Sequence, residues 1–259
     1  MIPRILHQIW PGTDPLPERL AYLLARNAKY CSDHGYQHWF WRIGETGALL
    51  LKTSATQYSV VDLSKKADPR MFAMLTDPKL HYVMKGDILR FVIDYLYGGY
   101  YADLDLLVCN LQDSFLELPY VCGYERERGG SGRPGCEQKP ICTGFFGAPQ
   151  GSPVNEAMAN HILDGYDAMR SSGKYPVDMW DVIALTVDPL VKICERLNVK
   201  PFPMEYFFPY PPKIETPPFS IHYYAGTEPG GWTFDMCKNE DCPTCKEKSI
   251  CKISRHGRR

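Results

Sequence analysis

The sequence predicts an α/β protein with a mostly parallel sheet flanked by helices, and two observations favour this class. Near the start, residues 2–10 and 36–41 have strand-like apolar patterns, and residues 16–30 between them have helical spacing. Strand, helix and strand in this order are typical of a parallel pair joined by a crossover helix. Farther along, an amphipathic helix runs into Gly98 and Gly99, and Tyr100 and Tyr101 then favour extended chain. The chain of 259 residues is long enough for a substantial core.

The segment between these two observations has weaker patterns. Residues 44–52 are expected to form a short helix, and the polar residues 53–70 a loop. Asp77 and Pro78 predict the start of a helix, because Pro is favoured at the first helical position. Gly86 is expected to interrupt that helix, and Asp87 then lies in the first turn of the next one, where a carboxylate meets free amides.

The second half of the chain alternates strands and helices. Its expected elements are strands at 106–109, 120–124 and 219–224 and helices at 153–171 and 178–197. Residues 200–219 are rich in proline, which favours an extended path over the surface.

Asp103 and Asp105 are the strongest candidates for a functional site. They follow the strand-like tyrosines, and at a period of two their side chains share one face unless the chain turns there. Two neighbouring carboxylates repel each other, so a fold that keeps them together favours a divalent cation between them. Two solvated loop aspartates are the alternative.

These residues belong to a longer motif. Gly86–Arg90 lies on the predicted helix, and Gly98–Asp105 reads Gly-Gly-Tyr-Tyr-Ala-Asp-Leu-Asp. The combination resembles the signature of glycosyltransferase family 32, which is related to fungal Golgi mannosyltransferases and to the glucosyltransferase domains of clostridial toxins. The resemblance implies a GT-A-like fold of Rossmann type and a nucleotide-sugar-dependent transferase that retains anomeric configuration.

The resemblance also implies roles for the motif residues. Asp105 is the direct ligand of Mn²⁺ or Mg²⁺, and Asp103 bridges the metal to ribose and phosphate. Asp87 and Arg90, which lie three apart on one helix face, bind hydroxyls of the donor sugar. Tyr101 packs beside the nucleotide. Catalysis is therefore assigned to Asp87, Arg90, Asp103 and Asp105.

Further positions resemble the family outside this motif. Residues 2–10 match its opening strand, so Trp10, with Ile9, is a candidate to stack on the base, and simple packing is the alternative. Thr143 stands where the family has an asparagine that contacts the sugar. His222 is a candidate metal ligand and Trp232 a candidate donor contact, although a histidine on a strand can also be structural.

The expected reaction follows from charge. Breaking the bond between an anomeric carbon and a nucleoside diphosphate leaves negative charge on phosphate, which a cation can neutralise. The resemblance implies a UDP-sugar or GDP-mannose as donor, and a glycan, a protein or a small molecule as acceptor. No nucleophile stands out, so front-face substitution is preferred. The glycine- and arginine-rich residues 125–139 form either a solvated hairpin tip or a loop that contacts the acceptor.

Two other functions remain open at this point. A phosphohydrolase of the haloacid dehalogenase type also carries Asp-x-Asp after an apolar strand, with Asp103 as nucleophile and Asp105 as acid. A non-catalytic sugar-binding module is the second alternative.

Bulk properties exclude some partners. A formal net charge of −1 gives no general attraction for nucleic acid. No apolar run of membrane-spanning length and no leader pattern is visible, so the chain is expected to be cytoplasmic, or a domain of something longer.

The ten cysteines fall into two groups. Six are scattered, and free thiols are expected for them. The others form a compact set that favours one structural Zn²⁺, with free thiols or disulfides as alternatives: Cys237, Cys242, Cys245 and Cys251. The expected organisation is therefore a GT-A-like domain at 1–234 and a cysteine-rich basic tail at 235–259.

Overall fold

The computed structural model describes residues 1–12, 14–44, 48–53, 58–125, 139–176, 179–207 and 219–222. Its main sheet has seven strands in the order β4-β3-β2-β1-β5-β8-β7. These strands are β1 (Ile5–Trp10), β2 (Gln37–Ile43), β3 (Leu49–Lys52), β4 (Ser59–Val61), β5 (Gly99–Ala102), β7 (Val121–Tyr124) and β8 (Ile141–Ala148). A second, two-stranded sheet pairs β6 (Leu106–Val108) with β9 (Ser220–His222).

The predicted α/β class is confirmed, and the parallel pairing lies at the centre of the sheet. β1 pairs in parallel with both β2 and β5, whereas β3, β4, β7 and β8 join the sheet antiparallel. The carboxyl ends of β1, β2 and β5 therefore meet at one edge, which is where ligands bind in sheets of this kind.

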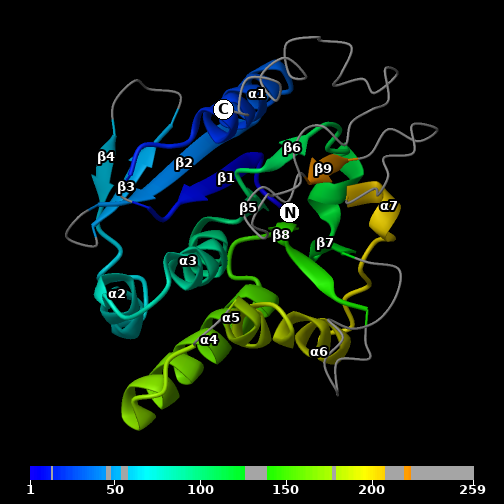
Figure 1. Cartoon of the computed structure of the whole chain (residues 1–259). Coiled ribbons are helices and arrows are strands. Elements are labelled where there is room, and N and C mark those ends of the chain that lie inside the picture. The colour runs from blue at the N-terminus through cyan, green and yellow to red at the C-terminus, as the bar shows by residue number, and fades with distance from the viewer. Residues whose placement is uncertain are drawn as a thin grey trace, which may run out of the picture.

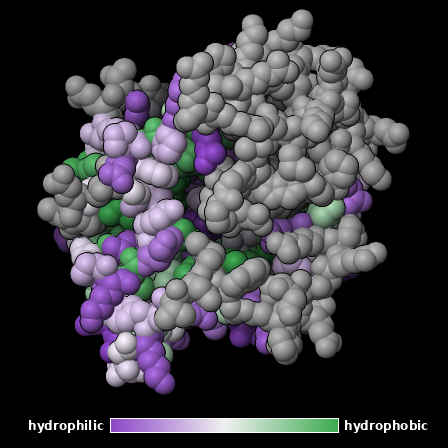
Figure 2. All heavy atoms as spheres, in the orientation of Figure 1, coloured by the Kyte–Doolittle hydropathy of each residue, from purple (hydrophilic) through white to green (hydrophobic). Residues whose placement is uncertain are grey.

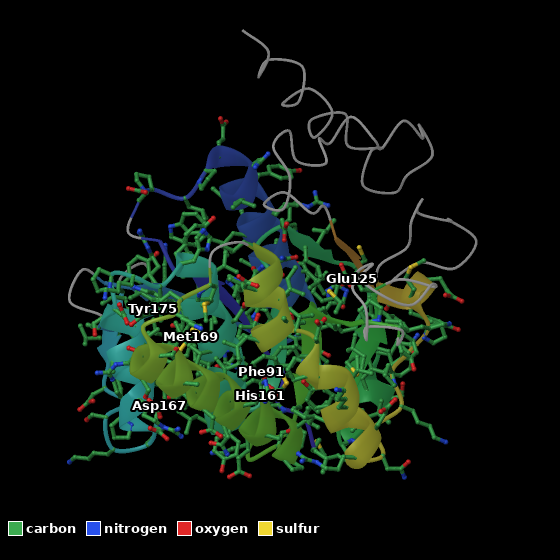
Figure 3. All side chains as sticks on the ribbon, turned by 60° about the horizontal axis from the view of Figure 1, so that its bottom comes forward. Phe91, Glu125, His161, Asp167, Met169 and Tyr175 are labelled. Atoms are coloured by element: carbon green, nitrogen blue, oxygen red, sulfur yellow. The ribbon has the colours of Figure 1, made fainter. Side chains whose placement is uncertain are left out.

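Helices cover both faces of the sheet (Figure 1). One face carries α1 (Glu18–Asp33), together with η1 (Asp113–Glu117) and α7 (Met204–Phe207). The other face carries α2 (Pro69–Thr76), α3 (Tyr82–Tyr97), α4 (Pro153–Ser172), α5 (Met179–Thr186) and α6 (Pro189–Arg196). Figure 3 shows α4, α5 and α6 in front of the sheet on this side.

Each face of the sheet has its own hydrophobic core. The core beneath α2–α6 includes Ile9, Trp41 and Phe146, and the core beneath α1 includes Leu6, Tyr100 and Phe145. Neighbouring strand residues thus point to opposite cores, as a period of two requires.

In the view of Figure 2, hydrophilic side chains gather over the outer end of α4.

Several predicted elements were wrong. Leu49–Lys52 forms strand β3 and not the end of a helix, because it pairs antiparallel with β2. The expected loop at 53–70 contains β4 and the first residues of α2. The predicted helix at 178–197 is two helices, α5 and α6, and residues 204–207 are helical.

The start of α3 is also different from the prediction. Asp77 is the C-cap of α2, and α3 begins at Tyr82, after His81 accepts a hydrogen bond from Val83. Gly86 therefore lies inside α3. A Cβ there would lie 3.4 Å from Cγ of Pro11, an ordinary contact distance, so this part of α3 lies beside the loop after β1. The helix ends at Tyr97 with Gly98 as its C-cap, as predicted.

Two further expectations can be compared with the structure. Five of the six scattered cysteines form no disulfide, as expected: Cys31, Cys109, Cys122, Cys142 and Cys194. The sixth, Cys136, lies outside the described residues. Within the part of the chain that the structure describes, the search for a helix both long enough and apolar enough to cross a membrane finds none.

Candidate active site

Asp103 lies at the carboxyl edge of the sheet, directly after β5. Its backbone NH donates to the carbonyl of Gly144 on β8 at 2.8 Å. The NH of Leu106 then donates to the carbonyl of Asp103 at 3.1 Å, so the chain turns between these residues. Asp105 is part of this turn and is partly exposed. Asp103 and Asp105 therefore lie in a turn and not on one strand, so the period of two that would place their side chains on the same face does not apply.

Arg90 connects the predicted site residues. Its guanidinium pairs with Asp87 at 2.5 Å and lies 3.5 Å from Asp103. Nη1 also donates to the carbonyl and the hydroxyl of Thr143, at 2.8 and 3.1 Å. The same group lies over the ring of Tyr101, whose hydroxyl donates to Asp103 at 2.6 Å. We call these five residues the Arg90 cluster.

The local sequence explains how the Arg90 cluster forms. Asp87 and Arg90 are three residues apart on α3, so they share one helix face. Tyr101 is on β5 and Thr143 on β8, which pair antiparallel beneath that helix. The structure thus brings together four of the residues that the sequence singled out around one guanidinium.

Burial and charge set the protonation of this cluster. Burial by itself lowers the pKa of Arg90, but the negative charges of Asp103 and Asp87 raise it above its ordinary value. Burial raises the pKa of Asp87, and Arg90 and a hydrogen bond with Thr186 oppose that rise. Burial also raises the pKa of Tyr101 well above its usual value, so its hydroxyl stays a donor to Asp103.

Asp103 differs from Asp87 in its access to solvent. The Asp103 side chain is 25% exposed, whereas that of Asp87 is 5% exposed. A Cβ at Gly144 would lie 2.8 Å from Oδ2 of Asp103, so the glycine provides the space that this oxygen occupies. Asp103 is therefore the member of the ion-paired group that can reach a ligand most directly.

The loop after β1 lies beside the same part of α3. Trp10 ends β1, and its indole NH donates to the carbonyl of Asp14 at 2.8 Å. Gly86, one residue before Asp87, packs against Pro11. Since β1 and β5 are parallel, Trp10 and Asp103 lie at the same edge of the sheet. The side chain of Ile9 is buried in the core, so only its backbone could contact a nucleotide.

The structure describes only the backbone of one remaining predicted site residue, His222, and none of the others. Residue 222 pairs with Leu106 across β6 and β9, which brings its backbone to the end of the Asp103–Asp105 turn. The side chain of His222, Trp232 and the four tail cysteines lie outside the described residues. Among the side chains that the structure describes, no group of three or more His, Cys, Asp or Glu residues forms a metal centre.

Two contributors were not assigned from the sequence. Thr186, fully buried at the end of α5, forms a hydrogen bond with Asp87. Gln8, buried inside β1, donates to the carbonyl of Asp103 at 3.2 Å. The sequence signal for both residues was a polar side chain within an apolar segment. A fold seldom buries such a side chain without a hydrogen-bond partner.

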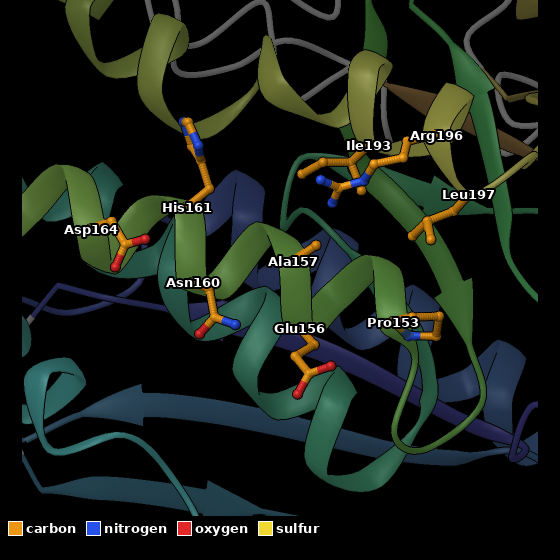
Figure 4. Close-up of a pocket in the computed structure, with 9 residues that line it drawn as sticks. All are labelled: Pro153, Glu156, Ala157, Asn160, His161, Asp164, Ile193, Arg196 and Leu197. Carbon is orange, nitrogen blue, oxygen red and sulfur yellow. The ribbon is translucent and has the colours of Figure 1, made fainter.

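A separate groove of about 470 Å³ lies between α4 and α6 (Figure 4). His161, Asn160 and Arg196 are among its lining residues, and it includes no member of the Arg90 cluster. It is therefore distinct from the candidate active site.

Comparisons with known proteins define the class of fold. Neither the protein-family models nor the curated proteins contain a match to this sequence. Among solved structures, the chain is similar to one described as "PaToxG Glycosyltransferase", with a TM-score of 0.53 and 16% identity over 76% of this chain and 70% of that one. The fold is thus an α/β fold of the GT-A-like class.

A second solved structure has a lower score. It is described as "crystal structure of a glycosyltransferase involved in the glycosylation of the major capsid of PBCV-1". Its TM-score is 0.42, with 11% identity over 84% of this chain and 92% of that one.

Proposed function

We propose that this protein is a metal-dependent glycosyltransferase that moves a sugar from a nucleoside-diphosphate sugar to an acceptor. The observation that carries the proposal is the Arg90 cluster, which joins Asp87, Asp103 and Thr143 at the carboxyl edge of the sheet. The GT-A-like fold and the resemblance of the same residues to family 32 support it.

The donor set fits a divalent cation with oxygen ligands. Asp103 and Asp105 would hold the ion. Mg²⁺ and Mn²⁺ suit such a site, because they bind through one or two carboxylates and complete their coordination with water and substrate phosphate. When bound, the ion neutralises the charge that develops on the leaving diphosphate.

Arg90 prepares the site for a ligand. Its positive charge reduces the repulsion between Asp87 and Asp103 before any ligand arrives.

The remaining residues are assigned to the donor. Asp87 and Arg90 bind the sugar hydroxyls, and the hydroxyl of Thr143 lies beside Arg90 to assist them. Trp10, at the same edge, stacks on the base of a UDP-sugar or GDP-mannose. With no nucleophile assigned, a front-face substitution with retention is proposed, and the acceptor is a glycan, a protein or a small molecule.

The test uses purified protein with a panel of UDP-sugars and GDP-mannose, with and without Mn²⁺. Thermal shift identifies the donor, and release of nucleoside diphosphate measures turnover. Asp103→Asn and Asp105→Asn should each abolish Mn²⁺-dependent turnover while the protein stays folded. Asp113→Asn is the matched control, because Asp113 is an exposed aspartate that pairs with Arg4.

Three results would contradict the proposal. Retained Mn²⁺-dependent turnover in both aspartate variants would refute the metal assignment. Release of phosphate from a simple phosphomonoester, with no response to nucleotide sugars, would favour the phosphohydrolase. Sugar binding without turnover, unchanged in Asp105→Asn, would favour a binding module.

A further inference from the structure

A chain of polar side chains crosses the three central strands of the sheet. His38 on β2 contacts Gln8 on β1 at 3.0 Å, between Nε2 and Oε1. Gln8 in turn donates from Nε2 to the carbonyl of Asp103, at 3.2 Å, after β5. Gln8 is fully buried, so its amide depends on these protein partners.

The direction of the hydrogen bonds in this series of side chains follows from its last group, the backbone carbonyl of Asp103. A backbone carbonyl can only accept, so the Gln8 atom that faces Asp103 must be the amide nitrogen. The Gln8 oxygen then faces His38, whose Nε2 must carry the proton. A neutral His38 with that proton agrees with its burial, which lowers its pKa to about 4.

The two faces of β1 have different roles. Gln8 and Leu6 share one face with His38 of the neighbouring strand, on the α1 side. His7 points to the opposite face, where it contacts the carbonyl of Gly98 at 2.9 Å and accepts from the indole NH of Trp41 at 3.1 Å. The two adjacent polar residues therefore belong to separate networks.

Asp103 is thus held from both sides of the sheet. On the α3 side, Arg90 and Tyr101 contact its carboxylate. On the α1 side, its carbonyl accepts from Gln8 and also from Leu106, which closes the turn that contains Asp105. A shift of the Gln8 amide would move the backbone of this turn and, with it, both aspartates.

We propose that Gln8 is a positioning residue for the Asp103–Asp105 turn, and that His38 holds the Gln8 amide in the required orientation. The effect of this positioning role on metal binding rests on the function proposed above. Partners that orient metal ligands typically affect metal affinity by 10- to 100-fold when they are replaced.

The test compares variants that remove one hydrogen bond at a time. Gln8→Met keeps the length of the side chain and removes both contacts, and Gln8→Glu keeps the acceptor for His38 but removes the donor to Asp103. His38→Phe removes the donor to Gln8, whereas His38→Gln can restore it. Trp41→Phe is the matched control, because it removes a buried hydrogen bond of β2 on the opposite face.

Two readouts separate positioning from general stability. Hydrogen exchange at residues 104–107 should be about fivefold faster in both Gln8 variants, as expected for the loss of one hydrogen bond of about 1 kcal/mol. It should also be faster in His38→Phe and close to wild type in His38→Gln and Trp41→Phe. By calorimetry with UDP or GDP present, whichever the wild type binds, both Gln8 variants should bind Mn²⁺ about tenfold more weakly.

The outcomes distinguish this inference from the proposed function. Unchanged exchange at 104–107 in folded Gln8 variants, or an equal increase in Trp41→Phe, would overturn the inference. If the Gln8 variants do not fold, the two His38 variants decide by the same exchange measurement. If wild-type protein binds no Mn²⁺ with either UDP or GDP while exchange follows the expected pattern, positioning of the turn is supported and the metal assignment is refuted.

Discussion

Replacement of Arg90 by Met tests whether burial makes its cluster important for stability. The variant keeps much of the side-chain volume but removes the charge and every hydrogen bond of the guanidinium. Asp87, whose side chain is 5% exposed, then loses its ion pair, and Thr143 loses the donor to its carbonyl and hydroxyl. Removal of one partner from a buried pair typically costs 3–5 kcal/mol, so we expect about 4 kcal/mol at pH 7.

Arg70 provides a control with more ion pairs and less burial. It contacts Asp68, Asp164 and Asp167 within 3.2 Å, but its side chain is 33% exposed. Exposed ion pairs contribute about 0–1 kcal/mol, because water screens them. We therefore expect Arg70→Met to cost about 1 kcal/mol, although Arg70 has more acidic partners than Arg90.

Urea denaturation of the two variants and the wild type at pH 7 and pH 4 measures both effects. In Arg90→Met, Asp87 is buried without its counter-charge, so its folded-state pKa lies above the unfolded value. The native state then favours protonation, and the loss of stability should be smaller at pH 4 than at pH 7. A cost of Arg70→Met equal to that of Arg90→Met would refute the argument from burial.

Two buried side chains outside the cluster give further predictions. Burial raises the pKa of Asp94 well above its usual value, and Asn155 donates to it at 2.6 Å. The raised pKa of Asp94 adds stability below the unfolded pKa of about 4, and this stability is lost as the pH rises. The stability of Asp94→Asn relative to wild type, measured in thermal melts, should therefore increase between pH 4 and pH 8. An equal difference at both pH values would contradict this. Asn27 bridges the backbone of β6, donating to Leu106 at 2.8 Å and accepting from Val108 at 2.9 Å. Asn27→Leu leaves both groups without that partner and should cost about 2–4 kcal/mol in urea denaturation, whereas a cost below 1 kcal/mol would show that water replaces the amide.

The sequence predicts those parts of the fold that depend on local pattern. The strand before Trp10 and the helix after Pro17 follow from apolar spacing, and Gly98 ends α3 because a glycine adopts its positive φ of 64° without strain. The pairing of Asp87 with Arg90 follows from their spacing on one helix.

Long-range contacts explain the failures. Leu49–Lys52 is a short apolar run that fits a helix or a strand, and its antiparallel pairing with β2 decides between them. Gly86 suggested a helix start, but it lies inside α3, beside Pro11, which is distant in sequence. The turn at Asp103 depends on Gly144 and Gln8, and no local pattern reports those partners.

The pairing of β6 with β9 has a consequence for synthesis of the chain. The strand that leaves the Asp103–Asp105 turn is made well before its partner, because Leu106 pairs with His222. Until Ser220–His222 leaves the ribosome, β6 presents an unpaired edge of the kind that invites wrong partners. A nascent chain arrested before residue 220 should therefore hold the Asp103–Asp105 turn less firmly, even with Arg90 and Gln8 already in place.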